Sequence, residues 1–175
     1  MSLPSKQAPA GLCAQAIADT FGDCFLETYG TYCTGGASEP LYLPASPTAP
    51  ARLTFRGDYA ASALHEISHW CVAGKRRRSL VDFGYDYVNT PRTAVQQVQF
   101  LRAEVRPQAL EWVFADSAGV RFNYSFDDVE DRFVVFRSGF RAAVNSVKAR
   151  LQAQGLGSTV GPRAAQFHRA LTQRQ

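Results

Sequence analysis

The stretch that decides the fold is His65-Glu66-Ile67-Ser68-His69, which has the H-E-x-x-H pattern of helical metal sites. Residues four apart on a helix share a face, so both imidazoles can point at one ion about 2.0–2.1 Å from each ring. Glu66 is turned by roughly 100° from His65 and can reach an open coordination position of the ion. Two of the three histidines of the chain lie in this motif. The pattern therefore predicts a metal centre carried by one helix.

A third ligand is expected from elsewhere in the chain, because two imidazoles and a water do not make a tight site. A metzincin would carry a histidine six residues after His69, but Lys75 stands there, so that subclass is excluded. Two histidines and one carboxylate on one face would leave coordination positions open. Such a set suits zinc hydrolases and also non-haem Fe(II) oxygenases, and the spacing does not choose between them.

Carboxylates downstream of the motif are the better candidates for this third ligand. Glu104 is the first choice, because the helix that carries it is expected to break at Pro107, and a side chain just before the break can turn inward. Asp82 and Glu111 are the alternatives. The remaining histidine, His168, is expected to be a surface or packing residue.

Apolar periodicity and turn signals predict a helix-rich chain with a few short strands. Helices are predicted over residues 12–29, 59–73 and 90–102, from Pro107 onward, and over 129–153 and 163–171, with strands over 41–43, 53–55 and 80–85. Asp58 and Gly74 are the expected caps of the motif helix, and Thr90 is the cap of the next. Residues 31–40 are expected to form a loop. The pattern indicates one α+β domain over residues 1–175, with helices dominant and a small sheet.

Composition places the chain among globular proteins. It has 175 residues, 46% of them apolar, which is enough for one buried core. No apolar run reaches the roughly 18 residues of a membrane span, and the first residues lack the apolar stretch of a signal peptide. The expected location is the cytoplasm. The four cysteines include no C-x-x-C pair, so buried or half-buried thiols are expected rather than a zinc cluster.

Basic residues are unevenly placed along the chain, whose net charge is +4. From Arg132 to Gln175 there are seven arginines and one lysine but no acidic residue. A second basic block, Lys75-Arg76-Arg77-Arg78, directly follows the motif helix. Such blocks either attract an acidic partner, protein or nucleic acid, or form solvated helix faces.

Four segments carry a resemblance to a known family. They read YAASALHEISHWCVAGK over residues 59–75, LVDFGY over 80–85, EVRPQAL over 104–110 and EPLYLPA over 39–45. Together they resemble the bacterial elongation factor P hydroxylases, and the likeness extends from the first predicted helix to the last. The run around the motif is long, and so it is far more specific than a bare H-E-x-x-H.

The resemblance implies an enzyme that hydroxylates the modified lysine at the tip of elongation factor P, after a β-lysyl group has been attached to that lysine. It also implies a zincin-like fold, with His65, His69 and Glu104 as ligands of Fe(II) and with O2 as cosubstrate, although zinc or another divalent ion could occupy the site. Glu66 would act as a base, position a water or an oxygen species, or only support the ligands. No H-x-D pair of the jelly-roll 2-oxoglutarate oxygenases is present, so that cosubstrate is not inferred.

The resemblance gives the basic block after the motif a use as well. Elongation factor P is acidic and shaped like a transfer RNA, so Lys75, Arg76, Arg77 and Arg78 are expected to steer it toward the site. Neither a membrane nor direct binding of nucleic acid is expected. Two other classes remain open at this point. One is an intracellular zinc peptidase of zincin type, and the other is a non-catalytic basic binding protein of the translation machinery.

Overall fold

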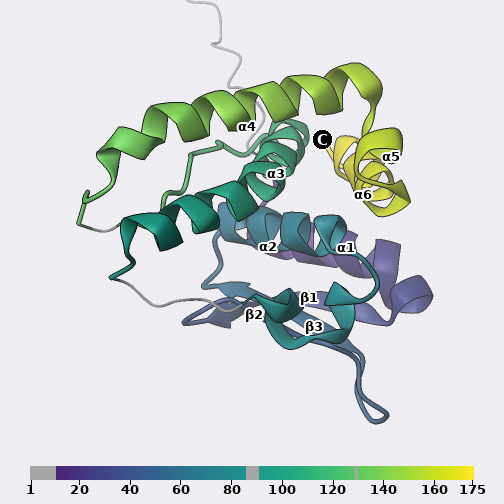
Figure 1. Ribbon diagram of the computed structural model, residues 1–175. Helices are drawn as coiled ribbons and strands as arrows, with labels where there is room; N and C mark the ends of the chain where they lie inside the picture. Colours follow the sequence, from purple (N-terminus) through teal and green to yellow (C-terminus); the bar gives the residue numbers. More distant parts are fainter. Residues whose placement is uncertain (1–10, 86–90, 129) are drawn as a thin grey trace, which may run out of the picture.

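The helices and strands follow the apolar pattern of the sequence through most of the chain (Figure 1). The structure is a computed structural model, which describes residues 11–85, 91–128 and 130–175. In chain order the elements are α1 (Ala14–Tyr29), β1 (Thr31–Ala37), β2 (Leu41–Leu43), β3 (Ala51–Arg56), α2 (Ala60–Val72), the 3-10 turns η1 (Arg77–Ser79) and η2 (Val81–Gly84), α3 (Ala94–Ala118), α4 (Val134–Gln154), α5 (Leu156–Thr159) and α6 (Pro162–Thr172).

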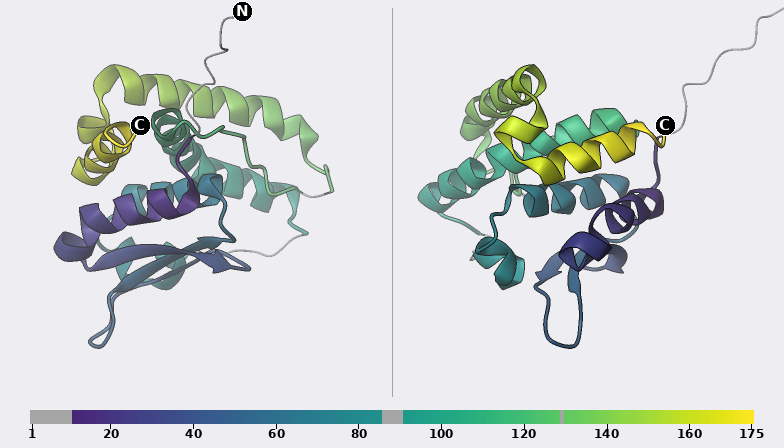
Figure 2. Two further views of the ribbon diagram at one scale, coloured as in Figure 1. Left: turned by 180° about the vertical axis from the view of Figure 1, so that it is seen from behind. Right: turned by 90° about the vertical axis from the view of Figure 1, so that its right-hand side faces the viewer.

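A small mixed sheet forms one end of the molecule. Its strand order is β1-β3-β2, with β1 parallel and β2 antiparallel to β3. Ala51, Leu53 and Phe55 alternate along β3 and are buried, so one face of the sheet packs against helices. Figures 1 and 2 show α1 and α2 across this face, α3 and α6 beyond them, and α4 outermost. The expected α+β class with dominant helices is confirmed.

An aromatic cluster joins three helices next to the sheet. Phe21 and Phe25 of α1 contact Trp70 of α2 with ring centroids 5.0 and 4.8 Å apart, and Phe167 of α6 lies 6.0 Å from Phe21. All four side chains are fully buried. Burying a side chain of this size contributes about 2–3 kcal/mol, so the cluster fixes the apolar side of α2 firmly. The opposite side of α2 is thereby turned toward α3.

The C-terminal end of α2 is held by two arginines. Arg78 donates to the carbonyl of Ala73 at 2.7 Å, and Arg163 of α6 donates to the carbonyls of Cys71 and Ala73 at 3.0 and 2.7 Å. Cations at this end satisfy carbonyls that lack helical partners and also oppose the helix dipole. The expected caps differ: α2 begins after Tyr59 without a side-chain cap, so Asp58 does not cap it, and Ala73 ends it in an extended conformation.

The helix α3 runs unbroken through Pro107, which corrects the expected break there. Proline removes one helical hydrogen bond, but its ring is buried and the helix packs against α2, α4 and α6 along its length. A capping box of Thr93 with Gln96 starts the helix. The expected cap, Thr90, lies outside the described residues. Glu104 therefore sits in mid-helix rather than near an end.

Two short segments also differ from their predictions. Residues 31–37, expected as a loop, form β1. Gly35 allows the backbone of β1 to pass close to that of Gly57, because a Cβ at this position would lie 2.5 Å from the Gly57 carbonyl oxygen. Residues 80–85, expected as a strand, contain η2, where Asp82 and Phe83 have φ of 47° and 58°. The Asp82 carboxylate accepts the Tyr42 N–H at 2.8 Å and so occupies a strand-edge donor of β2.

No helix in the described ranges is both long and apolar enough to cross a membrane.

Candidate metal centre

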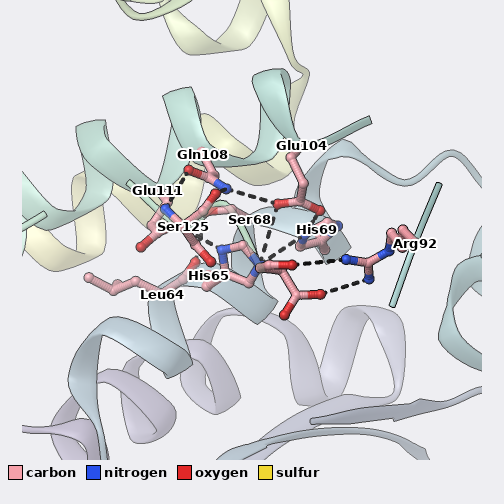
Figure 3. A network of polar contacts seen from close by, with 10 residues as sticks. Leu64, His65, Ser68, His69, Arg92, Glu104, Gln108, Glu111 and Ser125 are labelled. Carbon is pink, nitrogen blue, oxygen red and sulfur yellow. Dashed lines mark hydrogen bonds and ion pairs between the residues drawn. The ribbon is translucent and has the colours of Figure 1, made fainter. Parts of the chain in front are cut away.

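Three donor side chains from two helices converge where α2 faces α3 (Figure 3). His65 and His69 lie one turn apart on α2, and Glu104 reaches them from α3. The Nε2 atoms of the two histidines are 3.2 Å apart, and Glu104 places one oxygen 3.2 Å from His69 Nε2 and the other 3.6 Å from His65 Nε2. His69 and Glu104 are 5% and 4% exposed, whereas the His65 side chain is 24% exposed, so the donor group is shielded from water except on the side of His65.

These distances fit ligands of a single ion. Two donor atoms that each lie about 2.1 Å from an ion, at angles of 90–109°, are about 3.0–3.4 Å apart. The three observed separations are 3.2, 3.2 and 3.6 Å. Two imidazoles and one carboxylate occupy one side of such an ion and leave its other positions open. The donor set therefore suits a reactive metal better than a closed structural one.

Glu111 fixes the ring of His65 from behind. Its Oε2 lies 2.8 Å from His65 Nδ1, and because a carboxylate only accepts, Nδ1 carries the proton. In the neutral ring the lone pair is then on Nε2, which faces Glu104 and His69. Burial alone would lower the pKa of His65, but the hydrogen bond and charge of Glu111, with the charges of Glu104 and Glu66, raise this pKa to about 10.

Gln108 fixes Glu104 in a similar way. Its Nε2 donates to Glu104 Oε2 at 3.2 Å and to the Ser125 carbonyl at 2.8 Å, while its Oε1 accepts the Ser125 N–H at 3.1 Å. The backbone of Ser125 thus forces the NH2 group toward Glu104. Burial alone would raise the pKa of Glu104, but His69, His65 and Gln108 outweigh it and lower this pKa to about 2. The carboxylate is therefore ionised, as a metal ligand must be.

Two of the donors, His65 and Glu104, open onto a cavity of about 690 Å³. His65, Glu66 and Glu104 line it, together with Asp82 and Phe83 of η2. Burial raises the pKa of Glu66 despite the nearby histidines. Glu66 belongs to this cavity rather than to the group of three donors. It could therefore contact a molecule bound beside the donors.

An ion pair between the buried Arg92 and the half-exposed Asp127 borders the same cavity. Arg92 donates to Asp127 through both the carboxylate, at 2.7 Å, and the backbone carbonyl, at 3.1 Å, and its guanidinium lies 4.2 Å from the ring centroid of Phe100. Together with Gln97, which donates to the Phe126 carbonyl at 2.7 Å, it ties residues 120–128 to α3. That segment carries Ser125 and so supports Glu104 indirectly.

The alternatives considered for the third ligand lie outside the donor group. Asp82 is on the cavity wall, and Glu111 contacts the far nitrogen of His65. His168 is half buried on α6, where burial lowers its pKa. Among the described residues, the only group of metal-ligating side chains found is His65, His69 and Glu104.

The basic block after α2 divides into two parts. Lys75 and Arg76 have exposed side chains. Arg77 lies over the ring of Tyr85 at 4.4 Å, and Arg78 caps α2 and lies near Trp70. The block is therefore partly structural, which the sequence reasoning did not anticipate. Many C-terminal cations are engaged as well, because Arg137, Lys148 and Arg174 form ion pairs and Arg141 and Arg163 lie over aromatic rings.

Gln108, Arg92 and Asp127 were missed by the sequence reasoning. One signal could have found Gln108: the buried residues Gln97, Leu101, Glu104, Gln108 and Glu111 recur at helical spacing on one face of α3. Four of these five are polar or charged, which is unusual for a buried stripe and indicates a site. No local signal marks Arg92 and Asp127, whose pairing depends on the path of residues 120–128.

The fold and site together define an α+β protein with a candidate two-histidine, one-carboxylate metal centre at the edge of a cavity. The model of the elongation factor P hydroxylase family matches residues 20–174. The chain belongs to this family. It is 49% identical over 111 residues to the elongation factor P lysine hydroxylase of Haemophilus influenzae. The aligned region spans 62% of this chain and 62% of that relative.

Proposed function

We propose that this protein is a metal-dependent hydroxylase acting on the modified, β-lysylated lysine of elongation factor P. The observation that carries the proposal is the convergence of His65, His69 and Glu104 at ligand spacing beside an open cavity. Membership of the hydroxylase family and the name of the Haemophilus influenzae relative support the reaction and the substrate. They do not favour a zinc peptidase or a non-catalytic binding protein. Because the substrate is a translation factor, the proposed place of action is the cytoplasm.

The proposed ligands are His65, His69 and Glu104, and the proposed metal is Fe(II), with O2 as cosubstrate. Bound Fe(II) would supply the activation of O2 that C–H hydroxylation needs. The buried carboxylate would contribute one negative charge and the two neutral imidazoles none, and these three donors would leave coordination positions of the ion open. A zincin-like arrangement is part of the proposal, supported by a motif helix packed on a mixed sheet. We also propose that residues 1–175 act as one domain.

The protein side chains have separate tasks in this proposal. Glu111 and Gln108 hold the ligands in orientation, as the hydrogen bonds to His65 and Glu104 indicate. Glu66 lines the cavity beside the donors, where it would accept a proton from a bound water or return one to it. The shielding of His69 and Glu104 limits the access of bulk water to the reacting centre.

Mass spectrometry of elongation factor P tests the proposal directly. After incubation with the protein, Fe(II), O2 and a reductant, the modified lysine should gain the mass of one oxygen atom. His65→Ala and Glu104→Ala should each abolish this gain and also lose bound metal, while circular dichroism shows an intact fold. Metal analysis of protein prepared without oxygen separates Fe(II) from zinc. A full gain of oxygen with Glu104→Ala would exclude Glu104 as the third ligand.

A further inference from the structure

The cavity beside the donors carries an excess of negative charge. Six carboxylates and two arginines line it. Glu104 and Glu111 contact imidazoles, and Asp127 is paired with Arg92. Glu39, Glu66 and Asp82 form no ion pair within the parts of the chain that the structure describes. Even with a bound divalent ion, carboxylates remain in excess, so the cavity favours a cationic ligand.

Asp82 is the most rigidly held of these three carboxylates. Its Oδ1 accepts the Tyr42 N–H at 2.8 Å, and the next residue, Phe83, stacks on the Tyr42 ring at 4.3 Å with planes 11° apart. The Tyr42 hydroxyl in turn donates to the Arg78 carbonyl at 2.8 Å. The left-handed backbone of Asp82 and Phe83 is therefore braced by β2, which is in turn held to η1.

This bracing leaves one oxygen of Asp82 available. Within the described ranges, Oδ2 has no hydrogen bond or ion pair, and Asp82 lines the cavity with His65, Glu66 and Glu104. A carboxylate that is already oriented loses little entropy on binding a ligand. By contrast, Glu39 is exposed on the turn between β1 and β2, and its longer side chain has no hydrogen bond in the described structure to orient it.

The proposed substrate has matching chemistry. A lysine extended by a β-lysyl group carries two ammonium groups beyond the methylene carbons of the original lysine. When one of these carbons lies at the metal, the ammonium groups extend into the surrounding cavity. An unmodified lysine has one ammonium group at a shorter reach. The fixed carboxylate on the cavity wall is thus placed to distinguish the two side chains.

We propose that Asp82 binds an ammonium group of the modified lysine and so selects the extended, doubly charged side chain; this inference rests on the proposed function. Asp82 is then a specificity-determining residue and not a metal ligand. Asp82→Asn is the sharpest test, because the amide oxygen can still accept the Tyr42 N–H while the charge is lost. The variant should keep its thermal midpoint and its bound metal.

Kinetics with β-lysylated elongation factor P give the first readout. Loss of one close charge pair should raise KM about tenfold or more, with a smaller effect on kcat. Cadaverine, a simple diamine, should inhibit the wild type competitively and inhibit Asp82→Asn about tenfold more weakly. Asp58→Asn is the matched control, because Asp58 is exposed just before α2 and outside the cavity lining, and its KM should equal that of the wild type.

The outcomes separate the inference from the function on which it rests. A wild-type protein that adds no oxygen to elongation factor P contradicts the proposed function. An active wild type with an unchanged KM for Asp82→Asn, or equal inhibition of both proteins by cadaverine, overturns the role of Asp82 alone. Loss of metal from Asp82→Asn would also overturn it, because Asp82 would then act through the metal site.

Discussion

Glu111 and His65 are joined by a hydrogen bond of 2.8 Å on the ring nitrogen that faces away from Glu104 and His69. The two residues lie on different helices, 46 positions apart in the chain. Their contact sets the tautomer of His65, a proposed ligand. The register between α2 and α3 therefore decides which ring nitrogen of His65 can bind a metal.

Removal of the Glu111 carboxylate should weaken metal binding without unfolding the protein. Glu111→Leu leaves His65 free to rotate and to change tautomer, so affinity for Zn²⁺ or Fe(II) should fall about 10–100-fold. Glu111→Gln retains an acceptor and should have a smaller effect. Asp116→Asn is the control on the same helix, since Asp116 pairs with Lys148 away from the site. Metal titration checks the order, and equal affinity of all three variants would contradict it.

Metal binding should release a proton from His65. In the metal-free protein the pKa of His65 is raised to about 10, so at neutral pH the ring is protonated and its Nε2 must lose a proton to bind an ion. Affinity should therefore rise about tenfold per pH unit below that pKa. Glu104, with a pKa of about 2, is already ionised and adds no pH dependence there.

Calorimetry in two buffers of different ionisation enthalpy counts the protons released in this step. About one proton per ion from His65 is the expected result near neutral pH. Glu111→Gln removes the charge that raises the His65 pKa, so the variant should release a smaller fraction of a proton. A wild-type affinity that does not change with pH would show that His65 is neutral before the metal binds.

Gln108 should matter for both stability and metal binding. Gln108→Leu breaks one buried hydrogen bond to Glu104 and two partly buried ones to the Ser125 backbone, at a cost of about 2–3 kcal/mol in the free energy of unfolding. Metal affinity should fall about tenfold as Glu104 loses its orientation. Gln97→Leu is the matched control: it breaks one partly buried hydrogen bond to the same segment, at Phe126, without touching Glu104.

The Gln97 variant should lose stability but keep the metal affinity of the wild type. Chemical denaturation and metal titration of both variants distinguish the two effects. If Gln97→Leu weakens metal binding as much as Gln108→Leu does, then general loosening of residues 120–128, rather than the contact with Glu104, supports the site.

The exposed cations that follow α2 and the α6 arginine that holds the end of α2 should respond differently to substitution. Lys75 and Arg76 are exposed, so their joint reversal to glutamate should raise KM for elongation factor P most strongly at low salt, with no loss of stability. Arg163→Ala removes two hydrogen bonds to the end of α2 and should lower the free energy of unfolding by about 1–2 kcal/mol.

Steady-state kinetics at two salt concentrations measures the effect on KM, and thermal denaturation measures the effect on stability. An unchanged KM at low salt for the Lys75 and Arg76 double variant would mean that these side chains do not steer the substrate. A stable Arg163→Ala protein would mean that water replaces the arginine at the carbonyls of Cys71 and Ala73.

Local patterns determined much of this protein. The spacing of His65 and His69 and the apolar positions of α1, α2 and α6 are set by the helical repeat, which depends only on neighbouring residues. Glu104 was the first choice among three carboxylates, and the structure brings it to the histidines. The reason given for it was wrong, because α3 continues through Pro107 and Glu104 faces α2 from mid-helix.

Tertiary packing decided the rest. Tertiary contacts among α2, α3, η2 and residues 120–128 determine the roles of Asp82, Glu111 and Gln108. Sequence spacing does not predict these contacts. Local rules also failed where packing outweighs propensity: Gly35 lies in a strand because a backbone passes close to it, and residues 80–85 turn because a side chain of Asp82 replaces a strand partner. The sequence alone thus specified the two histidines and their helix, whereas the burial of α2 against α1 and α6 decided which distant carboxylates they face.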